Sequence, residues 1–148
     1  MKDTDKVLLA HGGGGGLSYQ LIKDLIIPAF DNNSKLKELD DAARVSFKNG
    51  RLAFSTDSFV VKPMFFPGGD IGSLAVCGTV NDLAMVGAEP LYISVSFIIE
   101  EGLSLTILKK VIDSMGKMVG RTGVQVVTGD TKVVEKGSLI SYSSTQPV

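Results

Sequence analysis

The stretch from Phe54 to Ile99 constrains the fold most, because signals for a helix and for two strands follow one another closely within it. A β-type run leads into Asp57, and a segment rich in proline and glycine separates it from a long apolar run. Asp70 stands where a helix N-cap belongs, and Gly87 stands where a C-cap glycine belongs, with Pro90 blocking any continuation. We therefore predict a helix from about Asp70 to Gly87.

The faces of this helix are apolar or small except at the adjacent pair Asn81 and Asp82. A polar group buried in a core costs about 2–7 kcal/mol unless it is hydrogen-bonded, and an unpaired charge costs more. Asp82 is therefore either a buried aspartate that caps a neighbouring backbone segment or a metal-binding or catalytic carboxylate on a rigid element. Cys77 falls among the apolar residues of the same helix and is expected to pack there as a small hydrophobic residue.

The length of 148 residues predicts one domain with a substantial core, and 44% hydrophobic and 21% charged residues are ordinary for a globular protein. The formal net charge of −1 gives no electrostatic reason to expect nucleic acid or an anionic membrane as a partner. A single cysteine excludes an internal disulfide and fits a reducing compartment. No apolar run reaches transmembrane length and the start is not signal-like, so the protein is predicted to be cytoplasmic.

Five consecutive glycines, Gly12–Gly16, follow the only histidine, His11. The run matches neither the phosphate-loop pattern, which needs a following Gly-Lys-Ser/Thr, nor the dinucleotide-binding pattern. Because glycines have no side chain to pack, we expect the run to be mobile without a ligand, either as a linker or as a lid that closes its N–H groups over an anion. A short amphipathic helix follows, from Leu17 to about Ile27, and Pro28 is expected to end it.

Two alternating apolar runs, Ala43–Phe47 and Leu52–Thr56, flank an Asn-Gly pair, which predicts a β-hairpin with a type I′ turn. In that register the carboxylates of Asp40, Asp41 and Asp57 collect at the open end of the hairpin. Like charges placed opposite one another destabilise a sheet, so this cluster indicates either a bound cation or a solvated acidic corner.

A further strand, Leu91–Ile99, alternates cleanly between an apolar face and a face of Tyr92, Ser94, Ser96 and Ile98. The second face is neither charged nor fully apolar. It suits a sheet surface that is covered by another element or by a partner chain.

A second amphipathic helix is predicted from Ser104 to Arg121, with Gly123 as its C-cap. A buried strand, Val124–Thr128, then runs into the tetrapeptide Gly129–Lys132. Glycine permits close backbone approach and lysine is a point-charge partner for phosphate, so the tetrapeptide is either a phosphate-binding segment or an ordinary polar turn.

Four acidic segments in this order resemble the superfamily of aminoimidazole ribonucleotide synthetase, selenophosphate synthetase and thiamine-phosphate kinase: Asp40–Ala43, Ser55–Asp57, Asn81–Met85 and Gly129–Thr131. Within that superfamily the chain most resembles the HypE family of hydrogenase maturation proteins. The segments that carry this closer resemblance are Thr56–Val61, Phe65–Gly72, Leu74–Met85 and Thr128–Val134, together with the His-Gly start at His11. The resemblance covers roughly residues 7–137.

The resemblance implies an α/β (α+β) fold, the N-terminal domain of the aminoimidazole ribonucleotide synthetase-like fold, with a mixed sheet and helices on one face. A second copy is expected to complete a barrel-like dimer core. The implied activity is ATP-dependent carbamoyl dehydration, in which a cysteine S-carboxamide received from the partner HypF becomes a thiocyanate. The thiocyanate supplies cyanide for NiFe hydrogenases, and HypC and HypD are implied as further partners.

The resemblance also implies a set of site residues for ATP and Mg²⁺. Asp41, Asp57, Asp82 and Asp130 are expected to bind the metal, with Ser55, Thr56 and Asn81 beside them, Lys132 facing phosphate, and Gly12, Gly13 and Gly14 contacting the nucleotide. Mg²⁺ prefers oxygen ligands and keeps waters and substrate phosphates in its coordination shell, which agrees with a carboxylate-rich set.

The implied organisation has three parts: a glycine-rich mobile arm and first helix (residues 1–40), an ATP-binding and dimerisation domain (residues 41–137) and a divergent tail (residues 138–148). The family's C-terminal domain and its terminal cysteine are absent, so no catalytic residue is assigned. The chain alone is expected to be inactive in carbamoyl dehydration, because a thiol among apolar residues, as expected for Cys77, is inert. Two alternatives remain: a non-catalytic dimerisation module, and a related small-molecule kinase of the selenophosphate synthetase or thiamine-phosphate kinase type.

Overall fold

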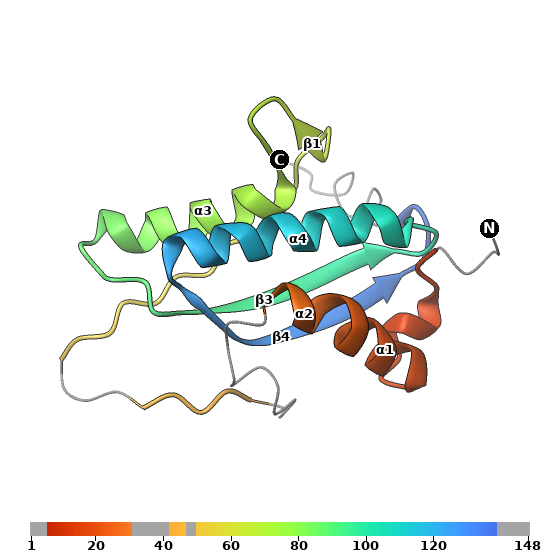
Figure 1. Cartoon of the computed structure of the whole chain (residues 1–148), viewed down its shortest axis with the longest axis horizontal. Coiled ribbons are helices and arrows are strands. Elements are labelled where there is room, and N and C mark those ends of the chain that lie inside the picture. The colour runs from red at the N-terminus through yellow and green to blue at the C-terminus, as the bar shows by residue number, and fades with distance from the viewer. Residues whose placement is uncertain (1–5, 31–41, 47–49, 139–148) are drawn as a thin grey trace, which may run out of the picture.

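Residues 6–30, 42–46 and 50–138 are described in the computed structural model. Figure 1 shows two long helices, α3 (Ile71–Met85) and α4 (Leu105–Thr122), over one face of two strands, β3 (Tyr92–Glu100) and β4 (Gln125–Val134). An N-terminal helical segment, which contacts β4 and α4, is made of η1 (Leu9–Gly12), α1 (Gly16–Leu21), η2 (Ile22–Ile26) and α2 (Ile27–Ala29). This arrangement confirms the expected α/β class with helices on one face of the sheet.

Helix α3 begins and ends where its sequence signals predict. The Asp70 carboxylate accepts the N–H groups of Gly72 (2.8 Å) and Ser73 (3.0 Å), and the Ser73 hydroxyl accepts the Asp70 N–H (2.9 Å). At the other end Gly87 adopts a left-handed conformation (φ 71°) and donates its N–H to the carbonyl of Ala84 (2.9 Å). The helix is therefore capped at both ends by groups close to it in sequence.

Strands β3 and β4 form a parallel pair joined by α4, which ends at Gly123 (φ 75°) as predicted. The sequence predicted that this strand ends at Thr128, but β4 continues through the tetrapeptide Gly129–Lys132. The reason is visible at Gly129, where an added Cβ would meet the Val95 carbonyl oxygen, so the glycine lets the two strands stay closely paired.

The core lies between the helices and the inner face of the strand pair. Helix α4 is amphipathic, as predicted, and the side chains that it buries are Leu108, Val111, Ile112, Met115 and Val119. Gly116 of this helix lies directly against the Ala29 carbonyl, which brings the N-terminal segment close. The buried cluster consists of Val7, Leu21, Ile26, Phe30, Val76, Val95, Ile99, Leu108, Ile112, Met115, Val119, Val124 and Val126.

Pro28 does not end the first helix, contrary to the prediction. The segment from Gly16 to Ala29 stays helical, and the turns before Pro28 widen into the π-helical η2. A proline inside an α-helix lacks an N–H and clashes with the carbonyl four residues before it. The wider π turn changes this hydrogen-bond spacing, which explains how the helix continues through Pro28.

The predicted hairpin around Asn49 and Gly50 is also wrong for the described residues. Residues 42–46 and 50–61 carry no assigned strand, and the turn residues 47–49 lie outside the described part. Leu52, Phe54 and Val60 are 74%, 91% and 97% exposed, so no layer covers these side chains, although the ring of Phe59 lies against Gly78 of α3. A two-stranded hairpin without a covering layer is marginally stable, which accounts for its absence here.

A small hairpin forms instead between β1 (Phe65–Phe66) and β2 (Gly69–Asp70), across a turn in which Gly68 has φ 92°. In the described part of the chain, no helix has both the length and the apolar character needed to cross a membrane.

Candidate functional site

A cavity of about 730 Å³ lies between the N-terminal helical segment and β4. Its volume is within the range of small-molecule sites, about 300–1,000 Å³. Four of the predicted site residues line it: Gly12, Gly14, Asp130 and Lys132. One wall is apolar, with Ile22, Ile26, Ile27 and Phe30, and the opposite side is formed by residues 126–132 of β4.

The glycine run at this cavity is held at two points. Gly12 lies against the backbone N of Val133, where an added Cβ would clash, and Gly14 (φ 76°) donates its N–H to the Ser18 hydroxyl (2.9 Å). The end of the run joins α1, where the Gly15 carbonyl accepts the N–H of Tyr19 (3.0 Å). Packing of Gly12 was not expected from the sequence, whereas mobility of the remaining run stays a prediction.

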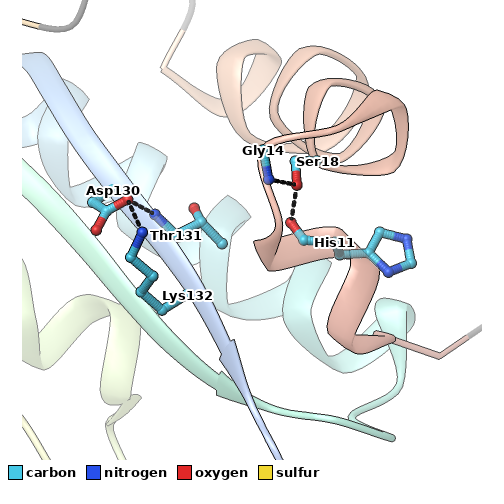
Figure 2. A network of polar contacts seen from close by, with 6 residues as sticks. All are labelled: His11, Gly14, Ser18, Asp130, Thr131 and Lys132. Carbon is cyan, nitrogen blue, oxygen red and sulfur yellow. Dashed lines mark hydrogen bonds and ion pairs between the residues drawn. The ribbon is translucent and has the colours of Figure 1, made fainter.

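His11 has a local structural contact. The N–H of Leu8 donates to His11 Nδ1 (2.9 Å), which closes the short turn η1. In Figure 2 the imidazole points away from Asp130 and Lys132. Its backbone carbonyl accepts the Ser18 hydroxyl (2.7 Å), so His11 contributes to the shape of the glycine segment.

On the β4 side, Asp130 and Lys132 form an open ion pair. The Lys132 Nζ lies 3.7 Å from the Asp130 Oδ1, which also accepts the N–H of Thr131 (2.9 Å), as Figure 2 shows. The side chain of Lys132 is 63% exposed and that of Asp130 is 58% exposed. Exposed ion pairs of this kind contribute only about 0–1 kcal/mol to the stability of the folded state. Little stability is therefore lost if Lys132 binds a phosphate, or Asp130 a metal ion, in place of the ion pair.

Three further predicted residues, Ser55, Thr56 and Asp57, line a second cavity of about 100 Å³, together with Ser94 of β3. The Ser55 hydroxyl donates to the Asp82 carboxylate (3.4 Å). Asp82 is exposed, so the alternative of a buried, backbone-capping aspartate is wrong. Asp57 and Asp82 thus lie at one corner of the molecule, where α3 meets the start of β3.

The two groups of residues are connected by the outer face of the strand pair. In the parallel register Ser94 pairs with Thr128 and Ser96 with Asp130, so all four lie on one sheet face. Two residues along a strand span about 7 Å, which is the offset between Ser94 at the small cavity and the level of Asp130. Asp130 therefore lies on the same sheet face as Ser94, which borders the Asp57–Asp82 corner.

The predicted four-carboxylate metal site is not assembled among the described residues. No group of three or more His, Cys, Asp or Glu side chains that could hold a metal ion occurs there, and Asp41 lies outside the described part. Asn81 is exposed and Gly13 is near the cavity in sequence, but neither lines either cavity. Convergence of the four carboxylates stays a prediction.

Cys77 is exposed, which corrects the expectation of a packed thiol. Helix α3 packs on α4 through its other side, which buries Gly72 and Val76, so the side that carries Leu74 and Cys77 faces outward. The sequence could not select between these sides, because the apolar residues of α3 are distributed around the helix and do not form one stripe.

The cavity residues that sequence reasoning missed include the polar Ser18 and Arg44 and the apolar Ile26 and Phe30. A serine in the first turn after a glycine run is a recognisable local signal, because such hydroxyls bond to nearby backbone groups. Arg44 was not considered as a site residue because it lies in the segment that was expected to form a strand.

The model of the family "AIR synthase related protein, N-terminal domain" matches residues 39–145. Carbamoyl dehydratase HypE from Cupriavidus necator is 50% identical over 134 residues, which cover 90% of this chain and 38% of that protein. A crystal structure of the hydrogenase maturation protein HypE in complex with ATP is 56% identical, with a TM-score of 0.85, over 88% of this chain and 38% of that one. The HypE–HypF complex also matches, with 52% identity and a TM-score of 0.57 over 80% of this chain and 37% of that one.

Proposed function

Because this chain belongs to the family of AIR synthase related proteins, through their N-terminal domain, we propose that it is the ATP-binding N-terminal half of a HypE-like carbamoyl dehydratase. In such an enzyme ATP drives the dehydration of a cysteine S-carboxamide to a thiocyanate, which supplies cyanide for the maturation of NiFe hydrogenases. The chain spans about two fifths of the length of the relatives it matches. We therefore assign nucleotide binding to this chain and the complete reaction to a longer protein.

The cavity beside β4 is the observation that carries this proposal. Its wall of Ile26 and Phe30 suits a nucleobase, whereas Gly14 and Lys132 suit phosphates. Arg44 adds a second cationic residue to the lining. The match to a crystal structure of HypE in complex with ATP supports nucleotide binding by a protein that contains this chain.

We propose that Mg²⁺ accompanies the nucleotide and is bound by Asp57, Asp82 and Asp130, with Asp41 completing the set. Two arrangements support this proposal: the Ser55–Asp82 hydrogen bond beside Asp57, and the position of Asp130 on the same sheet face. A metal bound by carboxylates and by phosphate oxygens would neutralise charge that develops on ATP.

The proposed partners are a second copy of this chain, HypF, HypC and HypD, and the proposed compartment is the cytoplasm. Exposed apolar residues on the outer sheet face and on the segment before β1, such as Ile98 and Phe54, support an isologous dimer. The match to HypE in its complex with HypF supports HypF as the donor of the carbamoyl group.

Isothermal titration of the purified chain with Mg–ATP tests the proposal. We expect saturable binding, and Lys132→Ala should weaken it about tenfold, since a charge-assisted contact to phosphate is lost. Lys136→Ala is the matched control, because Lys136 is exposed just beyond β4 and lines neither cavity. No binding at millimolar Mg–ATP would overturn the nucleotide assignment.

One observation favours the alternative of a non-catalytic dimerisation module: the segment before β1 exposes the apolar side chains of Leu52, Phe54 and Val60. The two functions differ in a thermal melt. A ligand that binds the folded state at 100 times its Kd stabilises it by about 2.7 kcal/mol. A chain that is dimeric in light scattering, but whose melting temperature Mg–ATP leaves unchanged, would be the module.

A further inference from the structure

Ser18 is the one buried polar side chain in the described part of the chain, with 6% exposure. Its hydroxyl accepts the N–H of Gly14 (2.9 Å) and lies 2.7 Å from the carbonyl oxygen of His11, to which it donates. The carbonyl of Ala10 is also near, at 3.3 Å. A single hydroxyl thus joins the residue before the glycine run, the middle of the run and the helix that follows it.

These bonds decide the shape of a segment that has no side chains of its own. Free glycines lose more backbone entropy on ordering than any other residue, so a run of five is costly to fix when a ligand arrives. The Ser18 hydroxyl fixes the run between His11 and Gly14 in advance, and the contact of Gly12 with Val133 anchors its start to β4.

The fixed segment faces the charged part of the cavity. Gly12, Gly14 and Ser18 line the same 730 Å³ space as Asp130 and Lys132. In Figure 2 the glycine segment lies on one side and the Asp130–Lys132 pair on the other. A phosphate chain that contacts Lys132 would therefore be enclosed by the wall that Ser18 holds in place.

We propose that Ser18 is a positioning residue for the nucleotide's phosphates: it keeps the glycine run closed over the cavity before ATP binds. This inference rests on the proposed nucleotide-binding function. Preorganisation raises affinity by removing an ordering cost, and it acts only on the part of the ligand that meets the ordered wall. Ser18 should therefore matter for ATP and not for adenosine.

The test measures the Kd of Mg–ATP and of adenosine for the wild-type chain, Ser18→Ala and Ser18→Thr. Ser18→Ala should weaken ATP binding about 3- to 10-fold, the effect of losing one hydrogen bond, and leave adenosine binding unchanged. Ser18→Thr keeps the hydroxyl and should restore the preference for ATP. Equal losses for ATP and adenosine, or no loss, would overturn the proposal.

Ser73→Ala is the matched control, because the Ser73 hydroxyl also closes local backbone, at the start of α3, yet lines neither cavity. It should lower stability without changing the ratio of the two Kd values.

A ligand-free measurement separates this inference from the nucleotide assignment and does not depend on Ser18→Ala folding. In hydrogen exchange followed by NMR, the Gly14 amide should exchange more slowly than the Gly15 amide in the wild-type chain. If the Gly14 amide exchanges as fast, the Ser18 arrangement is wrong even where ATP binds. If Gly14 is protected but ATP does not bind, the proposed function fails instead.

Discussion

The two faces of the β3–β4 pair are made by alternate residues of the same strands, yet they differ in burial and in charge. On the inner face Val95, Ile99 and Val126 are buried beneath the helices. On the outer face Ile98 is 60% exposed, and Asp130 and Lys132 stand beside small hydroxyl residues. The inner face holds the domain together and also lines the large cavity through Val95 and Val126, whereas the outer face carries the charged pair and the proposed surface for a second copy. The comparison predicts that mutations on the two faces separate stability from function.

The largest effect is expected where the helices cover the inner face. Ile112→Ala removes a fully buried side chain and should lower the free energy of unfolding by about 2–5 kcal/mol. Ile98→Ala on the outer face should change it by no more than about 0.5 kcal/mol. Urea denaturation of the two variants gives both values. Similar losses would mean that the outer face is covered in the chain as it exists in solution.

The next effect concerns assembly. Ile98→Asp places a charge on the outer face and should raise the dimer dissociation constant at least about tenfold, because an unpaired charge is costly to bury. Light scattering over a concentration series reports the dimer, and urea denaturation of the monomer is the control for folding. A wild-type chain that stays monomeric at tens of micromolar would remove the proposed dimer.

The third effect concerns the metal. Asp82→Asn keeps the shape of the side chain but removes its charge, and should weaken Mg²⁺-dependent ATP binding about tenfold. Asp24→Asn, an exposed position on η2 that lines neither cavity, is the matched control. Titrations of ATP in the presence of Mg²⁺ and in the presence of EDTA show whether Asp82 acts through the metal. If Asp82→Asn weakens ATP binding equally in EDTA, Asp82 does not act through the metal.

The smallest effect is expected at the cap of α3. Asp70→Ala removes the acceptor of two backbone N–H groups and should cost about 1 kcal/mol of stability. The affinity for Mg–ATP should not change, since Asp70 lines neither cavity. A thermal melt and one titration are sufficient. A change in affinity without a loss of stability would contradict the division between the two faces.

The helices were predictable because their signals are local. Asp70 and Gly87 are next to the backbone groups that they satisfy, and the amphipathic pattern of α4 identifies its buried face without reference to other elements. The same holds for β3, which was expected one residue earlier at each end.

The errors occurred where the outcome depends on distant parts of the chain. Alternation in residues 43–47 and 52–56 indicates strands, but a strand needs a neighbour and a covering layer, which the sequence pattern does not supply. The sequence indicated a strand end before Gly129. The glycine is needed there because the Val95 carbonyl of the neighbouring strand approaches it closely, and this contact cannot be read from the local sequence. The candidate site shows the same limit of sequence-based prediction. The residue types of the site follow from the sequence motifs, but the placement of Asp57 and Lys132 in two different cavities depends on how the strands pack.

The parallel pairing of β3 with β4 also sets an order of events during synthesis. Antiparallel strands can pair as soon as a short turn is made, but β3 must wait until the whole of α4 and then β4 have left the ribosome. Until then β3 lacks the strand with which it pairs, while its apolar side, with Val95 and Ile99, is already made. A nascent chain that stalls before Gln125 would therefore present an unpaired apolar edge, the kind of surface that chaperones bind and that aggregates.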